Sequence, residues 1–324
     1  MNSAAESIIT KKRIKAIFSN TNFILFVLLI ILIILGGFLH PSFLKITNLL
    51  NIARIVSLTG IMAVGMTFIL LVGEIDLSVG SILSISAVVG GQFLHLGLLP
   101  VLLFTIGTGI FAGLINGLII IKTKAPALIV TLGSLIIYGG LANIICGGKS
   151  VYPYNLASYT WIGQGKILSI PFPVIIFIIV TLLSIFVLNL TSYGRWIYFA
   201  GANRKAATYS GGKTNLIILI SFVISGICAS ISGPMISSQI NRIWPTQGAG
   251  YELTAITIAV LGGTSLWGGK GGVFGTFIAA LIFGGLINLL NLTGVGTYLQ
   301  EVVKGLLLII IVGLMQLREW RNLE

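Results

Sequence analysis

The acidic residues that could carry charge inside this chain are few, and they stand at the ends of apolar segments. The sequence holds seven acids in 324 residues, and four of them, Glu74, Asp76, Glu252 and Glu301, lie in or beside apolar runs. A charge at the centre of a bilayer costs at least about 2.5–3.5 kcal/mol, so such a group usually faces a cavity or another polar group. A secondary transporter driven by protons or sodium ions is expected to hold acids deep in its spans, and these positions argue against that class.

Asp76 and Ser78 belong to the sequence GEIDLSVGS and are typical of a helix start. An aspartate here can accept hydrogen bonds from the free amides of the first turn, and its charge suits the positive end of the helix dipole. Glu252 opens a later apolar segment after a Gly-rich turn, and we expect a similar role for it. Proton coupling, or a gate at the cytoplasmic mouth of a transport path that includes Glu74, remains the alternative.

Neutral polar residues also mark a possible path through the apolar segments. Thr131, Ser134 and Tyr138 occur at i, i+3 and i+7, which places them on one face of a helix. Asn288 and Asn291 have the i, i+3 spacing in a later segment. These side chains could line a route for a neutral polar solute by hydrogen bonding without a fixed charge. Hydrogen bonding between helices is the alternative that the spacing leaves open.

Motifs for nucleotide binding, metal binding or hydrolysis are absent from the sequence. There is no G-x-x-x-x-G-K-[ST] phosphate loop, no H-E-x-x-H and no G-x-S-x-G. Cys146 and Cys228 form no C-x-x-C pair, and His40 and His95 each stand near the end of an apolar run. We therefore expect no catalytic residue, no metal site and no cofactor bound by this chain.

The composition places these residues in a membrane. Hydrophobic residues make up 56% of the sequence and charged residues 8%, whereas a soluble domain has about 25% charged residues. The formal net charge is +12, but the basic residues stand between apolar runs. This pattern indicates orientation in a membrane and argues against nucleic-acid binding. The expected fold is an all-α polytopic membrane protein with one transmembrane domain.

About ten segments are apolar enough to be membrane spans, each of which needs roughly 20 residues. The breaks at 73–76, 97 and 268–271 are short, so a count of eight or nine stays open. The expected domains are an N-terminal tail at 1–21, a transmembrane domain at 22–316 and a C-terminal tail at 317–324. The candidate spans are 22–39, 48–72, 77–96, 98–121, 126–145, 173–190, 215–238, 252–267, 272–293 and 296–316.

Basic residues predict the side of the membrane on which each connection lies. With ten spans and the N-terminus inside, thirteen Lys and Arg residues fall in cytoplasmic pieces and four in external loops, which is the bias of the positive-inside rule. Both tails are then cytoplasmic. The loop 191–213, which carries four basic residues and breaks the apolar sequence, is cytoplasmic as well.

A glycine run predicts close helix packing. Gly109, Gly113 and Gly117 form consecutive small-xxx-small steps on one helix face. Small residues let helix backbones approach closely in a membrane, where lipid offers no hydrophobic drive between helices. The contact could lie within one subunit or between two subunits.

Three stretches of the chain resemble the permease subunits of bacterial ABC importers for ribose and other simple sugars. They are VGMTFILLVGEIDLSVGS (64–81), GANRKAATYSGG (201–212) and PTQGAGYELTAITIAVLGGTSLWGGKGGVFGT (245–276). The resemblance runs over nearly the whole chain from about residue 41. It implies the ABC importer permease fold, in which two permease subunits work with separate ATPase subunits.

The resemblance also implies a role for the loop 191–213. In such importers this loop forms a short coupling helix that docks in a groove of the ATPase, and closure of two ATPases moves the paired loops and switches the cavity between outward and inward access. Arg204 and Lys205 could pair with acids at the rim of that groove. The family pattern G-x-N-x-x-A-A-x-x-S-G is matched by Gly201, Asn203, Ala206, Ala207, Ser210 and Gly211.

The chain departs from the family pattern at three positions. Glu74 stands where members commonly have glycine, Gly212 where they usually have isoleucine, and Thr254 where they often have aspartate. These departures suggest a divergent member of the family or one half of a heterodimeric pair.

The function expected from these observations is that of a transmembrane subunit, not an enzyme, in an ABC importer that moves a ribose-like monosaccharide across the bacterial inner membrane. The expected partners are an ATPase subunit that binds ATP and Mg²⁺, a second permease subunit in a homodimer or heterodimer, and a periplasmic or lipid-anchored sugar-binding protein. The alternatives are a self-sufficient secondary transporter or channel for a small polar solute, and an ABC permease for a nucleoside or branched-chain amino acid.

Overall fold

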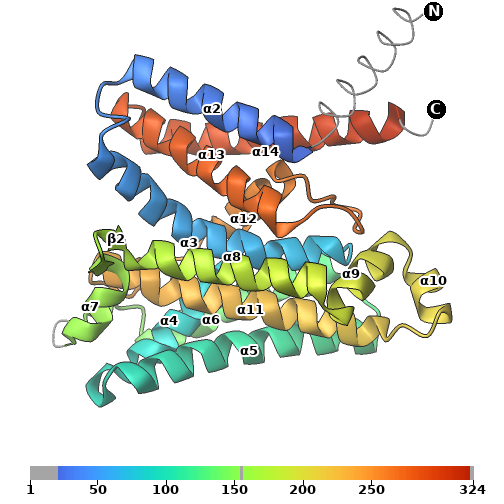
Figure 1. Cartoon of the computed structure of the whole chain (residues 1–324). Helices are drawn as coiled ribbons and strands as arrows, with labels where there is room; N and C mark the ends of the chain where they lie inside the picture. Colours follow the sequence, from blue (N-terminus) through green and yellow to red (C-terminus); the bar gives the residue numbers. More distant parts are fainter. Residues whose placement is uncertain (1–20, 154–155, 322–324) are drawn as a thin grey trace, which may run out of the picture.

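The chain folds into a bundle of long α-helices (Figure 1). The structure is a computed structural model that describes residues 21–153 and 156–321, so the predicted N-terminal tail lies outside the described residues except for Thr21. Eight helices in the described ranges are long and apolar enough to cross a membrane. They are α2 (Thr21–Leu39), α3 (Ile46–Leu71), α5 (Leu98–Thr123), α6 (Ala127–Cys146), α8 (Phe172–Leu190), α11 (Thr214–Gln239), α13 (Val273–Leu292) and α14 (Thr297–Arg321).

Two of the predicted spans, 77–96 and 252–267, are shorter helices. They are α4 (Val79–Gly91) and α12 (Tyr251–Leu261), with 13 and 11 residues. At 1.5 Å per residue they reach about 20 Å and 16 Å, less than the roughly 30 Å of a hydrocarbon core. The second helix stops at a glycine pair, because Gly263 takes a φ of +87° that a continuing helix does not allow. The all-α polytopic fold is thus confirmed, with eight full-length helices and two partial ones in the described chain.

Helices α3 and α11 form the centre of the bundle. In the most apolar 18-residue stretch of each helix, 83% of the residues of α3 and 61% of those of α11 are buried. The corresponding fractions are 11% in α2 and 6% in α14, which lie at the periphery. Helix α3 packs against α8, α11, α12 and α13, and α11 packs against α3, α4 and α5. The central helices therefore hold the short helices and the outer helices together.

The glycine run of α5 packs within the subunit, against α11. A Cβ atom on Gly109 would lie 2.4 Å from the carbonyl oxygen of Gly226, and one on Gly113 would lie 2.3 Å from that of Phe222. Real Cβ atoms do not approach so closely, so glycine is required for this contact. Of the two alternatives that the sequence left open, packing within one subunit or between two, the first explains Gly109 and Gly113.

The remaining elements lie at the two ends of the bundle. Helices α9 (Ser192–Ala202) and α10 (Arg204–Tyr209) lie at the end where α2 starts and α14 finishes, and we call this the α10 end (Figure 1). Helix α7 (Ala157–Gln164) and the hairpin of β1 (Lys166–Ile167) and β2 (Ile170–Pro171) lie at the opposite end, the α7 end (Figure 1).

An internal repeat relates α4 and α5 to α12 and α13. The sequence AVVGG at 87–91 resembles AVLGG at 259–263, and GLIN occurs at both 113–116 and 285–288 with the same spacing. The starts of α4 and α12 meet where Gly80 lies against Gly248 and Glu252. Many transporters are built from inverted repeats with interrupted helices, and their substrate sites lie where those helices meet.

Candidate coupling site and polar hub

Helices α9 and α10 form the loop that the sequence predicts to be a coupling element. Asn203 caps α10, since the Ala206 N–H donates to its Oδ1 at 2.9 Å. Thr191 caps α9 through its hydroxyl. Ser210 follows the last residue of α10, and Gly211 then turns the chain with a φ of +84°. The local sequence therefore fixes where each of these short helices begins and where α10 ends.

The predicted coupling residues divide between two faces of α10. Ala207 is fully buried against the bundle, and Ala206 is half-buried. Lys205, Tyr209 and Ser210 are exposed, and the large aromatic side chain of Tyr209 is 89% exposed. Among the described residues, the face of α10 that is free to meet another protein is the exposed one with Lys205 and Tyr209.

Gly201 joins the end of α9 to the transmembrane bundle. A Cβ atom here would lie 1.8 Å from the Leu71 carbonyl oxygen at the end of α3 and 2.6 Å from the Gly269 nitrogen. The Gly269 N–H itself donates to that Leu71 carbonyl at 2.9 Å. Three segments thus meet backbone to backbone, and only glycine permits this at position 201.

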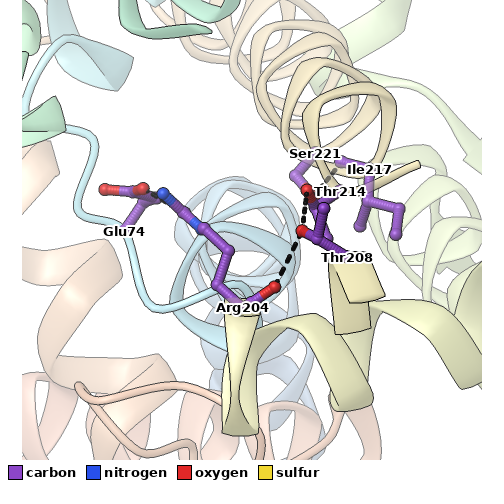
Figure 2. Close-up of polar contacts among 6 residues, drawn as sticks. All are labelled: Glu74, Arg204, Thr208, Thr214, Ile217 and Ser221. Atoms are coloured by element: carbon purple, nitrogen blue, oxygen red, sulfur yellow. Dashed lines mark hydrogen bonds and ion pairs between the residues drawn. The ribbon is translucent and has the colours of Figure 1, made fainter. Parts of the chain in front are cut away.

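An ion pair ties α10 to the segment that follows α3. The Arg204 guanidinium donates to a carboxylate oxygen of Glu74 (Figure 2). On its other side α10 is held by Thr208, whose hydroxyl donates to the Arg204 carbonyl at 2.9 Å and is 3.1 Å from the Thr214 hydroxyl at the start of α11 (Figure 2). Side-chain contacts therefore link α10 both to the segment after α3 and to the start of α11.

Residues 74–78, which we call the α3–α4 hub, are bonded to several helices. Thr131 of α6 accepts from the Leu77 N–H at 3.1 Å and donates to the Ile75 carbonyl at 3.3 Å. Ser225 of α11 donates to Asp76 Oδ2 at 3.2 Å. Together with the Glu74 ion pair, these bonds link α10, α6 and α11 to the start of α4.

Asp76 is fully buried in the turn before α4, and its carboxylate bonds to Ser78 there and not to an amide inside the helix, so the expected cap of the first helical turn is not formed. The Asp76 Oδ1 accepts from the Ser78 N–H at 2.9 Å and from the Ser78 hydroxyl at 2.6 Å. A buried carboxylate needs such donors, because burial without them is costly. The side chain of Asp76 thus holds the turn that leads into α4 and links it to Ser225 of α11.

Asn116 of α5 lies at the centre of a buried polar network. Its Nδ2 donates to Ser78 Oγ at 2.8 Å, while its Oδ1 accepts from Ser134 Oγ at 2.6 Å and from Tyr138 OH at 3.1 Å. Ser134 and Tyr138 therefore bond to α5 through Asn116, and Thr131 bonds to the α3–α4 hub. All three residues predicted on one face of α6 thus make hydrogen bonds to other segments of the chain. Sequence reasoning missed Asn116 and Ser225, although the repeated GLIN sequence could have pointed to the first.

The remaining polar candidates also make contacts inside the chain. Asn288, which occupies the position of Asn116 in the repeat, exchanges two side-chain hydrogen bonds with Asn48 of α3, at 2.9 and 3.0 Å. Asn291 accepts from Gln300 at 2.8 Å. Glu252 lies at the start of α12, and its Oε1 accepts from the Gly250 N–H at 3.1 Å. The described residues contain no group of three or more His, Cys, Asp or Glu that could hold a metal ion.

In the part of the chain that the structure describes, eight apolar helices long enough to cross a membrane, two short helices that meet inside the bundle and a small capped helix at one end define a polytopic membrane transport protein. The family described as "Branched-chain amino acid transport system / permease component" matches residues 48–312. The chain belongs to this family of permeases, and as a permease subunit it is not catalytic.

Individual relatives cover most of the chain. It is 39% identical to the ribose import permease protein RbsC of Haemophilus influenzae, over 89% of this chain and 90% of that protein. It is 39% identical to RbsC of Bacillus subtilis, over 88% and 89%. It is also 37% identical to the D-allose transport system permease protein AlsC of Escherichia coli, over 89% of both chains. No solved structure matches the chain.

Proposed function

We propose that this chain is the transmembrane subunit of an ATP-driven importer for a monosaccharide, with a ribose-like sugar as the first candidate. The observation that carries the proposal is the 39% identity to two ribose import permeases over almost the full length of each chain. Other similar proteins include ones named for D-allose, galactofuranose and xylose transport. A pentose or hexose therefore fits better than the branched-chain amino acid in the family description.

The energy for transport comes from a separate ATPase subunit that binds ATP and Mg²⁺ and docks on α9 and α10. The exposed face of α10, with Lys205 and Tyr209, supports this docking surface. Aromatic side chains such as that of Tyr209 are enriched where proteins meet. Gly201, Asn203 and the buried Ala207 shape the element and attach it to the bundle, while Arg204 pairs with Glu74.

The complete importer contains a second permease subunit, identical or homologous, and receives its sugar from a periplasmic or lipid-anchored binding protein. The transmembrane domain at 22–316 crosses the bacterial inner membrane, and both tails lie in the cytoplasm. The bias of basic residues supports this orientation. This orientation also requires both tails and the coupling loop to lie on one side of the membrane. The start of α2, the end of α14 and the α9–α10 pair do lie at the same end of the bundle (Figure 1).

Uptake by the assembled complex tests the proposed cargo. Cells that express the permease with its ATPase and binding protein are given radiolabelled ribose, and unlabelled ribose, allose, leucine and a nucleoside are added as competitors. We expect competition by one or more monosaccharides and none by leucine or the nucleoside. Absence of labelled-ribose uptake by the assembled complex, or competition by leucine or the nucleoside as strong as that by unlabelled ribose, would contradict a ribose-like cargo.

A substitution on α10 tests the coupling surface. Changing Tyr209 to glutamate alters an exposed side chain and leaves the buried Ala207 contact intact. We expect loss of uptake with normal amounts of permease in the membrane. The matched control is Tyr298→Glu, another tyrosine that is 88% exposed but lies at the start of α14, at a distance along the chain from the docking surface. Equal uptake by the Tyr209 variant and the unaltered protein would argue against docking on this face.

A further inference from the structure

The starts of α4 and α12 meet near the middle of the membrane. Leu135 and Gly139 of α6 lie near the centre of that 20-residue helix, and both line the same cavity as the first turn of α4 and the start of α12. A 20-residue helix is about 30 Å long, which is the thickness of a hydrocarbon core. The cavity is therefore at a depth where lipid surrounds the outer face of the bundle.

This cavity is small, and a few polar side chains stand in its mainly apolar lining. Its volume is about 140 Å³, below the roughly 300–1,000 Å³ of sites for drug-sized ligands, so it suits a small solute. Ser81, Ser84, Thr246 and Glu252 supply its polar lining. The Ser84 hydroxyl oxygen accepts a hydrogen bond from the Gly248 N–H at 2.9 Å, which leaves its own hydrogen to be donated to a solute.

Glu252 brings an ionisable group to this depth. One carboxylate oxygen accepts a hydrogen bond from the N–H of Gly250, the residue before α12, and the other lies beside Gly80 of α4. Within the ranges 21–153 and 156–321 no Lys, Arg or His forms a salt bridge with it. A carboxylate at mid-membrane depth does not face lipid, because it must lie against water or polar groups. This side of the subunit must therefore border an aqueous or polar space.

The loop before α12 has further hydrogen-bonding capacity. Gln247 is 3% exposed, and neither atom of its side-chain amide has a hydrogen-bond partner among the described residues. It lies between Thr246, which lines the cavity, and Gly248, which bonds to Ser84. An unpaired buried amide is costly. The loop is thus suited to complete its hydrogen bonds with water or a polar solute that enters beside it.

We infer that this cavity is where the imported monosaccharide contacts the permease, with Glu252 accepting hydrogen bonds from sugar hydroxyls and Ser84 and Thr246 as further partners. A carboxylate accepts several hydrogen bonds and donates none, which suits a ligand rich in hydroxyl groups. The inference rests on the proposed function, since it takes a monosaccharide as the cargo. Helix α4 connects this site to the α3–α4 hub, and through Glu74 to Arg204 of α10.

Cysteine labelling tests the environment of the cavity without relying on transport rates. Thr246→Cys is made in a chain carrying Cys146→Ser and Cys228→Ala, and the assembled complex is treated in membranes with a membrane-impermeant maleimide. Ile137→Cys is the matched control, because Ile137 is in the same stretch of α6 as Leu135 and Gly139 but is 58% exposed on the outer surface. Thiols react as thiolates, which form in water and not in lipid.

We expect the cysteine at 246 to be labelled, the cysteine at 137 to stay unlabelled, and the transported monosaccharide to slow labelling at 246 during turnover. Equal reactivity at the two positions would overturn the inference. Labelling at 246 that the sugar leaves unchanged would also overturn it.

A second experiment separates the site from the proposed function. Glu252→Gln and the control Glu301→Gln, which removes an exposed acid on α14, are assayed with saturating sugar-loaded binding protein. The loss of a charge-assisted hydrogen bond should lower sugar import by Glu252→Gln about tenfold or more, while Glu301→Gln keeps the rate of the unaltered complex. Sugar import at an unchanged rate in Glu252→Gln would overturn the site alone. Absence of sugar import in the unaltered complex would overturn the proposed function.

Discussion

The ion pair between Glu74 and Arg204 predicts a charge-swap result. Reversing either charge places two like charges where α10 meets the α3–α4 hub, so Glu74→Arg and Arg204→Glu should each uncouple ATP hydrolysis from transport. The double variant restores an ion pair with its charges exchanged. We expect it to recover a large part of the sugar transported per ATP hydrolysed.

The size of the effect follows from the exposure of the two side chains. Arg204 is 46% exposed and Glu74 is 14% exposed, so water screens the pair, and it should contribute about 0.2–1 kcal/mol. One kcal/mol changes an equilibrium about fivefold, and should change the thermal midpoint of so long a chain by at most about 2 °C. Neutral variants such as Glu74→Gln should therefore fold normally while their coupling ratio falls up to about fivefold.

The assay uses proteoliposomes that contain the permease, its ATPase and loaded binding protein, and it measures sugar uptake and ATP hydrolysis together. Arg195→Glu serves as the control, because Arg195 is an exposed cation on α9 whose guanidinium donates to Ser192. It reports the effect of charge reversal on the docking surface in general. If the double variant shows the two single defects added together, Arg204 acts on the ATPase or elsewhere, and the proposed link to the hub is wrong.

Three further predictions concern the parts that position this link. Asn203→Ala removes the cap of α10, costs that helix about 1 kcal/mol and should weaken ATPase binding in a pull-down, whereas Asn203→Asp should retain it. Asn116→Leu removes the buried acceptor of the Ser134 hydroxyl, at about 1–3 kcal/mol, while Tyr138 keeps the Ala112 carbonyl as a partner at 3.2 Å, and the change should lower the thermal midpoint of the purified permease by a few degrees. Gly113→Val forces α5 away from α11 and should reduce the yield of folded protein in the membrane more than the same change at the open Gly133.

The sequence predicted the helical membrane fold and most elements, because long apolar runs and basic connections are strong local signals. The helix start after Asp76 and the polar break at 191–213 also depend on nearby residues and were recognised from the sequence, whereas the cap at Asn203 was not predicted. The short lengths of α4 and α12 could not be predicted, because apolar residues continue beyond the ends of both helices. The tertiary structure shows that both helices begin inside the bundle, because Gly80 meets Gly248 and the two helix starts share a cavity with the middle of α6.

The polar network required the tertiary structure. The i, i+3, i+7 spacing places Thr131, Ser134 and Tyr138 on one face of α6. The spacing does not say whether that face lines a transport path or packs against another helix. The partner that decides the matter, Asn116, comes from a different helix and stands among apolar residues. The pairing of Glu74 with Arg204 joins residues that are 130 positions apart, and no local pattern predicts it.

Reconstitution of the purified chain tests the central claim most directly. The permease is placed in liposomes alone, or together with its ATPase and a loaded sugar-binding protein, and accumulation of radiolabelled ribose is followed with and without ATP. The account predicts accumulation only when all components and ATP are present, and its loss when Tyr209→Glu disrupts the exposed face of α10. Sugar flux through liposomes that hold this chain alone would contradict the account and indicate a self-sufficient transporter or channel.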